Sequence, residues 1–118
     1  MDYRHLLYST EHAVAVIRLN RPQSLNAMTI ELMDELNHAF ERAASTGSVR
    51  VIVLTGEGRG FSSGADLAVN SAKPPLDLQG RLDLGQALDR CYNPLILKMR
   101  ALPKPVIAAV NGMAAGAG

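Results

Sequence analysis

The sequence has few of the residues that crosslink small folds or bind metals. It contains one cysteine, Cys91, no tryptophan, two phenylalanines and three tyrosines. A single cysteine cannot form an internal disulfide, and without a Cys-x-x-Cys or Cys/His spacing it does not indicate structural zinc. We therefore expect a reducing, cytoplasmic location and no metal site.

The sequence also lacks an excess of charge of one sign and a long hydrophobic run. Its 12 basic and 11 acidic residues give a net charge of +1, too small to attract nucleic acid or an anionic membrane surface. The apolar runs are too short to cross a bilayer, and the first residues, "MDYRHLLYSTEH", do not resemble a signal peptide. We expect a protein that binds neither nucleic acid nor a membrane.

Apolar segments with turns between them predict three core strands. The 118 residues are 47% hydrophobic, which is enough for one core. Residues 12–20 predict a buried strand, with "LLYST" as its hairpin partner. Residues 49–56, "VRVIVLTG", predict a strand that is buried on both faces, and residues 104–112, "KPVIAAVNG", predict a third core strand in the same sheet.

Helical periodicity lies between these strands, and the alternation predicts a layered α/β fold. Residues 29–44 predict an amphipathic helix with Thr29 as its N-cap and Gly47 just past its end. Residues 70–80 predict a loop, and residues 81–102 a helix that Pro94 must kink or divide. The predicted apolar face of the first helix consists of Ile30, Met33, Leu36, Phe40 and Ala43.

Two glycine-rich segments follow the second and third predicted strands. The first, "GEGRGFSSGAD", spans residues 56–66, and the second, "NGMAAGAG", spans residues 111–118. Both can present backbone N–H groups without obstruction by side chains. Two such donors converging on a carbonyl oxygen form an oxyanion hole, which stabilises the charge of an enolate. Either loop alone is more typical of a tight turn between a strand and a helix, and only their pairing favours the oxyanion hole.

Other kinds of site fit the sequence less well. The dinucleotide-binding pattern G-x-G-x-x-G fails because Phe61 occupies the third glycine position. Asp66 is more typical of a helix cap or an Asx turn than of a catalytic acid. Ser62 and Ser63 lack the nucleophile elbow of serine hydrolases.

Three blocks of the sequence, "LNRPQSLNAM", "VIVLTGEGRGFSSGADL" and "LPKPVIAAVNGMAAGAG", resemble the enoyl-CoA hydratase/isomerase (crotonase) superfamily. They stand in the family's order and span nearly the whole chain. The last block, with the residues before it, resembles the ring-epoxyphenylacetyl-CoA isomerases of phenylacetate degradation. The resemblance implies a crotonase-like α/β fold, a spiral of strand-strand-helix units. Residues 1–118 would be its amino-terminal part, an incomplete acyl-CoA-binding core.

The resemblance also implies roles for individual residues. The backbone N–H groups of Ala65 and Ala117 would form the oxyanion hole, although many relatives have glycine where Ala117 stands. Gln23 replaces a basic residue of many relatives, so a charge-assisted contact with a CoA phosphate would be missing there. The implied substrate-binding residues are Gln23, Ser24, Ala27, Ser63, Gly64, Asp66, Leu67, Gly112 and Gly116.

The substrate implied by the resemblance is an acyl-CoA thioester, whose double bond would be hydrated or isomerised, as in fatty-acid or phenylacetate metabolism. No separate cofactor is implied, because coenzyme A is part of the substrate. Full-length members of the family form homotrimers or pairs of trimers. Their proton-transferring carboxylates lie after the second loop, beyond position 118, so we expect the 118 residues alone to be inactive.

Two other functions remain open at this stage. A non-catalytic module or pseudoenzyme would bind CoA esters without turnover. A fragment of a dinucleotide-binding oxidoreductase would bind NAD(P) in place of CoA.

Overall fold

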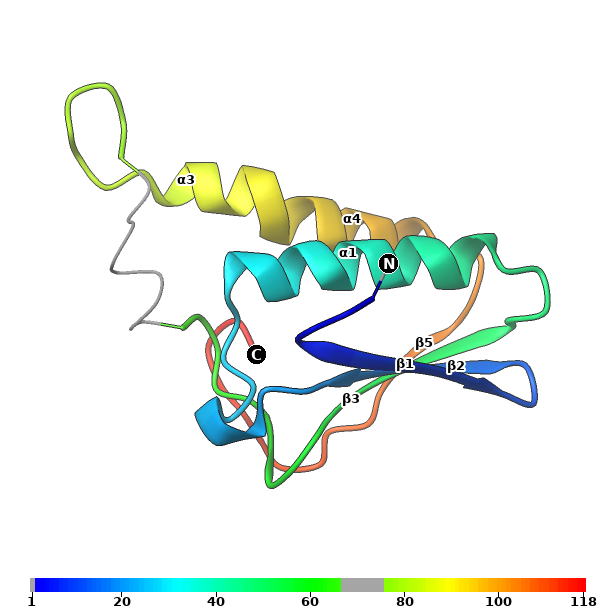
Figure 1. Cartoon of the computed structure of the whole chain (residues 1–118). Helices are drawn as coiled ribbons and strands as arrows, with labels where there is room; N and C mark the ends of the chain where they lie inside the picture. The colour runs from blue at the N-terminus through cyan, green and yellow to red at the C-terminus, as the bar shows by residue number, and fades with distance from the viewer. Residues whose placement is uncertain (1, 67–75) are drawn as a thin grey trace.

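The described residues, 2–66 and 76–118 of the computed structural model apart from the side chains of Leu84 and Ala87, form two small sheets and a layer of helices (Figure 1). The strands and helices follow one another as strand, strand, helix, and this order then repeats. The chain thus shows the succession of strand-strand-helix units that the sequence predicted.

The main sheet has the strand order β1-β2-β3-β5. β1 (Leu6–Glu11) and β2 (Val14–Leu19) form the predicted antiparallel hairpin, and β3 (Val51–Gly56) pairs with β2 in parallel. β5 (Val106–Ala108) pairs in parallel with the other edge of β3. This pairing confirms that the second and third predicted strands share one sheet.

A second sheet consists of two short strands. β4 (Gly60–Ser62) continues from β3 after a tight turn, and β6 (Met113–Ala114) follows β5 in the same way. The two strands pair in parallel. Each therefore carries one of the glycine-rich segments, and the pairing brings the two segments together.

Helix α1 (Ile30–Ser45) covers one face of the main sheet (Figure 1). Thr29 is its N-cap, as predicted, because its hydroxyl oxygen accepts a hydrogen bond of 3.2 Å from the Leu32 N–H. Gly47 lies just past the end of the helix, as predicted, and directly follows the C-cap residue Thr46. Ile30, predicted on the apolar face, is 39% exposed. The buried side chains of α1 are Leu32, Met33, Leu36, Ala39, Phe40 and Ala43.

The second helical stretch is divided close to Pro94, as predicted. It begins with α3 (Leu84–Ala87), widens into the π-helical turn η2 (Leu88–Tyr92) and continues as α4 (Asn93–Ala101). Pro94 lies in the first turn of α4, directly after the π-helical turn, so the helical hydrogen-bond pattern changes close to the residue that lacks an N–H. α4 lies beside α1 (Figure 1), and Lys98 of α4 forms an ion pair of 2.5 Å with Glu41.

The face of the main sheet opposite α1 is less covered than the sequence predicted. On β3, Ile52 is fully buried but Val51 and Val53 are only half-buried. On β5, Val106 packs against the core while Ile107 is 52% exposed. The burial on both faces predicted for β3, and the core position predicted for all of residues 104–112, were therefore wrong for the described chain.

The described part of the chain contains no helix long and apolar enough to cross a membrane.

The Thr29 cap can be tested by substitution. We expect Thr29→Ala to lower the free energy of unfolding by about 1 kcal/mol, because the Leu32 N–H loses its acceptor. Urea denaturation measures the change, and Ser48→Ala in the exposed turn after α1 is the control. Equal stability of the two variants would show that the cap contributes nothing.

Candidate active site in two glycine-rich loops

The first glycine-rich loop is fixed by the side chain of Asn26. This residue is fully buried and has a left-handed backbone (φ 54°), which asparagine tolerates better than most residues. Its Nδ2 group donates hydrogen bonds of 3.0 Å to the carbonyl oxygens of Glu57 and Gly60. Its Oδ1 atom accepts one of 2.8 Å from the Arg21 N–H. One amide thus joins the turn after β2 to the turn after β3.

Asn111 holds the same turn from the second loop. Its Nδ2 group donates to the carbonyl oxygens of Gly58 and Gly60, at 3.0 and 3.2 Å. Its Oδ1 atom accepts a hydrogen bond of 3.1 Å from the Gly56 N–H. The Gly60 carbonyl oxygen is therefore shared between Asn26 and Asn111, one from each side.

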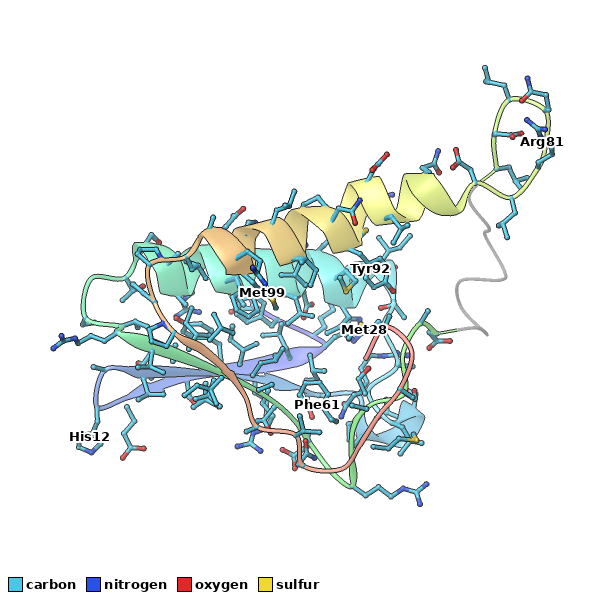
Figure 2. All side chains as sticks on the ribbon, turned by 180° about the vertical axis from the view of Figure 1, so that it is seen from behind. His12, Met28, Phe61, Arg81, Tyr92 and Met99 are labelled. Atoms are coloured by element: carbon cyan, nitrogen blue, oxygen red, sulfur yellow. The ribbon has the colours of Figure 1, made fainter. Side chains whose placement is uncertain are left out.

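The two glycine-rich loops lie in contact over several residues. The Ala115 N–H donates a hydrogen bond of 3.0 Å to the Ser62 carbonyl oxygen. A β-carbon on Gly64 would lie 2.8 Å from the Ala115 carbonyl oxygen and 3.3 Å from the Ala117 nitrogen, and the φ of Gly64 is +96°. Figure 2 shows the C-terminal segment passing Met28 and Phe61 on its way to the chain end.

The N–H of Ala65 points away from the neighbouring strand segment. Gly64 and Asp66 bond to Met28 on either side of it, because the Met28 N–H donates to the Gly64 carbonyl at 2.7 Å and the Asp66 N–H donates to the Met28 carbonyl at 2.9 Å. In extended backbone, successive N–H groups point to opposite sides. Ala65 is exposed, and its N–H has no hydrogen-bond acceptor among the described residues.

The N–H of Ala117 is exposed in a tight turn. The turn is closed by a hydrogen bond of 2.8 Å from the Gly118 N–H to the Ala115 carbonyl, and Gly116 has φ +54°. In such a turn the N–H of the third residue is not used to close it. Within residues 2–66 and 76–118, the Ala117 N–H has no acceptor. The two residues predicted to form an oxyanion hole thus lie on touching loops, and the N–H of each has no acceptor in the described part of the chain.

Most of the other predicted substrate-binding residues lie around these loops. Gln23 and Ser24 are in η1 (Pro22–Ser24), where Gln23 is exposed. The Ser63 hydroxyl donates a hydrogen bond of 3.4 Å to the Ser24 carbonyl oxygen, so this turn lies against the first loop.

Three of the remaining predicted residues differ in their burial and packing. Ala27 is buried, and Gly116 is exposed in the turn of the second loop. A β-carbon on Gly112 would overlap the carbonyl oxygen of Arg59, so its glycine serves the contact between the loops. Leu67 lies outside the described residues.

The side chain of Asp66 pairs with an arginine, and the helix cap or Asx turn predicted for it would involve residues 67–75, which lie outside the described residues. Its side chain is 9% exposed and forms an ion pair of 3.1 Å with Arg21, whose side chain is 13% exposed. Sequence reasoning missed Arg21 altogether, as well as the two asparagines. The only sequence signal was that all three lie in the motif blocks that carry the family resemblance.

Two nucleophilic side chains of the described chain, those of Ser62 and Cys91, are occupied or inaccessible. The buried Ser62 hydroxyl donates to the Asn26 carbonyl at 2.8 Å and accepts from the Gly64 N–H at 3.2 Å. Cys91 is buried, and burial raises the pKa of its thiol, with the nearby Asp34 charge acting in the same direction. Among the described residues of this region, the groups that can act on a ligand are therefore mainly backbone N–H donors.

Known proteins share both the sequence and the fold. The family model "Enoyl-CoA hydratase/isomerase" matches residues 9–118. The chain is 41% identical over 113 residues to a 1,2-epoxyphenylacetyl-CoA isomerase of Escherichia coli, covering 96% of this chain and 42% of the relative. It is 42% identical over 118 residues to a protein of Rhodobacter capsulatus named as a probable enoyl-CoA hydratase, covering all of this chain and 42% of the relative.

The crystal structure of an enoyl-CoA hydratase/isomerase from Xanthobacter autotrophicus superposes with a TM-score of 0.82 at 35% identity. The superposition covers 94% of this chain and 40% of that chain. The crotonase-like α/β fold predicted from the sequence is thereby confirmed. The chain spans about two-fifths of the length of the relatives it matches.

The contact between the loops predicts a strong effect of one methyl group. We expect Gly64→Ala to destabilise the protein by at least about 1–3 kcal/mol, because alanine is strained at φ +96° and its β-carbon would press on the Ala115 carbonyl. Gly47→Ala is the matched control, since a β-carbon there meets nothing within 4 Å. Chemical denaturation of both variants measures the difference, and a Gly64→Ala variant as stable as Gly47→Ala would disprove the close contact.

Proposed function

Because the chain belongs to the enoyl-CoA hydratase/isomerase family, we propose that it binds an acyl-CoA thioester and stabilises the thioester enolate with the N–H groups of Ala65 and Ala117. The reaction would be the hydration or isomerisation of a double bond in the acyl group. The observation that carries the proposal is that Ala65 and Ala117, exposed residues on two loops that touch each other, have N–H groups without an acceptor in residues 2–66 and 76–118.

Backbone donors suit this chemistry because they are fixed before the substrate arrives. When a base removes a proton next to the thioester carbonyl, negative charge builds up on the carbonyl oxygen. Donors already held in place stabilise that charge without reorganisation, and removal of one such donor typically lowers kcat by about 10²–10³-fold. The hydrogen bonds of Asn26 and Asn111 supply this rigidity on the two loops.

The coenzyme A part of the substrate would lie along η1. Gln23 is exposed there, and Ser24 is tied to Ser63 of the first loop. A ligand that reaches from η1 to the Ala65 N–H would pass the contact between Ser24 and Ser63. Since Gln23 carries no charge, we expect affinity for the phosphates to depend little on this residue.

Proton transfer needs a group that we do not assign to the described residues. Asp66 is paired with Arg21, and Glu57 lies 3.7 Å from Arg18 on the far side of the turn. We therefore propose that the 118 residues alone bind the thioester without turnover. The longer enzyme would act as a trimer in the cytoplasm, and the isomerase of Escherichia coli makes an aromatic acyl group the first candidate.

A backbone substitution tests the role of Ala65 directly. Replacing Ala65 by its α-hydroxy acid converts the amide to an ester, which removes the N–H and also makes the Gly64 carbonyl oxygen a weaker acceptor for the Met28 N–H. In the protein expressed from its complete reading frame, we expect kcat with enoyl-CoA substrates to fall about 10²–10³-fold, with a smaller change in KM. The same replacement at Ala109, whose N–H bonds to the Leu54 carbonyl within the main sheet, is the control and should affect stability more than kcat.

Binding measurements separate this proposal from the other two functions. Calorimetric titration with an acyl-CoA and with NAD(P)H should show binding of the acyl-CoA only. Binding of acyl-CoA without turnover by the complete reading frame would favour the non-catalytic module. Absence of acyl-CoA binding, or an unchanged kcat in the Ala65 ester, would refute the proposed oxyanion hole.

A further inference from the structure

We infer that Arg21 and Asp66 act as positioning residues that aim the Ala65 N–H at the substrate. The inference rests on the proposed function, since it assigns a task to two residues behind the proposed donor. Neither residue needs to touch the substrate. Their ion pair links the turn after β2 to the residue that directly follows Ala65.

The geometry places the Arg21 guanidinium across the short strand pairing that holds Ala65. Met28 and Ala65 form an isolated parallel bridge. Arg21 Nη1 donates to the carbonyl oxygen of Ala27, just before Met28, and to Oδ2 of Asp66, just after Ala65. One nitrogen therefore contacts both segments of the bridge, next to the two residues that form it.

This arrangement fixes the direction of the Ala65 N–H as well as its position. The Met28 hydrogen bonds fix the edge of the 64–66 segment that faces Met28, and so fix the opposite direction for the Ala65 N–H. If the segment rotates about its axis, the N–H turns away from the carbonyl oxygen it should meet. The Arg21–Asp66 contact resists this rotation at the residue directly after Ala65.

The Arg21–Asp66 ion pair is shielded from water, so removing one partner is costly. With side chains only 13% and 9% exposed, the two charges attract each other more strongly than a surface pair does. Removing one partner leaves the other charge buried without its counter-ion, which is strongly unfavourable. The backbone near Asp66 would then move to bring the remaining charge to water, and Ala65 would move with it.

A second role for Arg21 supports the assignment. Its backbone also organises the turn, because its carbonyl oxygen accepts hydrogen bonds from the Ser24 and Asn26 N–H groups at 3.1 and 2.9 Å. The Arg21 backbone is therefore fixed by hydrogen bonds at both its carbonyl oxygen and its N–H, and the guanidinium extends from this fixed residue. A rigid base of this kind is what a positioning contact requires.

The test uses three variants of the protein expressed from its complete reading frame: Asp66→Asn, Arg21→Met and the double variant. We expect each single variant to lower kcat by about 10–100-fold with KM changed by less than about threefold, since a misplaced donor weakens binding of the transition state more than of the ground state. The double variant should lose no more than the worse single variant, because both act through one contact.

An infrared measurement distinguishes positioning from mere stability. An unreactive saturated acyl-CoA bound to the wild-type protein should show a thioester carbonyl stretch shifted to lower frequency by hydrogen bonding. The shift should shrink in the single variants even at temperatures where circular dichroism shows them folded. Arg18→Met is the matched control, because Arg18 and Glu57 form an ion pair of 3.7 Å that is about half exposed and lies outside the bridge. It should leave kcat and the shift unchanged.

The outcomes are distinct for the two proposals. If the wild-type protein binds acyl-CoA without any carbonyl shift, the proposed oxyanion hole fails. If the wild type shows the shift and the folded variants show it undiminished with normal kcat, the positioning role fails. Should both single variants be unfolded, Arg21→Lys and Asp66→Glu keep the charges but change their reach, and a normal kcat and shift in both would overturn the inference.

Discussion

The carbonyl oxygen of Gly60 is the point on which the candidate site depends. Two asparagine side chains, Asn26 and Asn111, donate to it from segments that are 34 and 51 residues away in the sequence. Each asparagine also binds a second carbonyl of the same turn, at Glu57 and Gly58 respectively. A turn rich in glycine would otherwise have many conformations. Four hydrogen bonds to its carbonyls reduce these to one and hold the two loops against each other.

A site made of backbone donors places unusual demands on the sequence. The proposed functional atoms carry no signature of their own, because every residue except proline has an N–H. The sequence shows its constraints around them, at positions such as Gly64 and Gly112 where a β-carbon would collide with the opposite loop. At Ala117, by contrast, a side chain is tolerated because the residue is exposed. The constraints on residue type therefore fall on the packing that orients the proposed donors.

The elements that local patterns determine could be predicted from the sequence. The hairpin of β1 and β2, the cap at Thr29 and the division near Pro94 each follow from a few neighbouring residues. The predictions that failed concern burial, which depends on what other segments pack against a strand. Ile107 looks like a core residue in its strand, but the described chain leaves it half exposed.

The polar contacts of the site could not be predicted in the same way. A hydrogen bond from Asn111 to Gly60, or an ion pair between Arg21 and Asp66, joins segments far apart and leaves no periodic pattern. Asn26 and Arg21 also look like ordinary turn residues when the sequence is considered alone. The family resemblance named the proposed donors, Ala65 and Ala117, but gave no indication of the side chains that hold their loops in place.

The parallel pairing of β4 with β6 has a consequence for how the protein reaches its folded state. The two strands are separated by the helical stretch that contains α4, so they can pair only after a long loop has been closed. Asn26 can bind its turn earlier, since fewer residues intervene. We therefore expect the first clamp to form before the second, and the proposed donors to come together in a late, slow step. Until β5 has also paired, the edge of β3 on that side is open to pairing with other chains, which exposes the folding chain to aggregation.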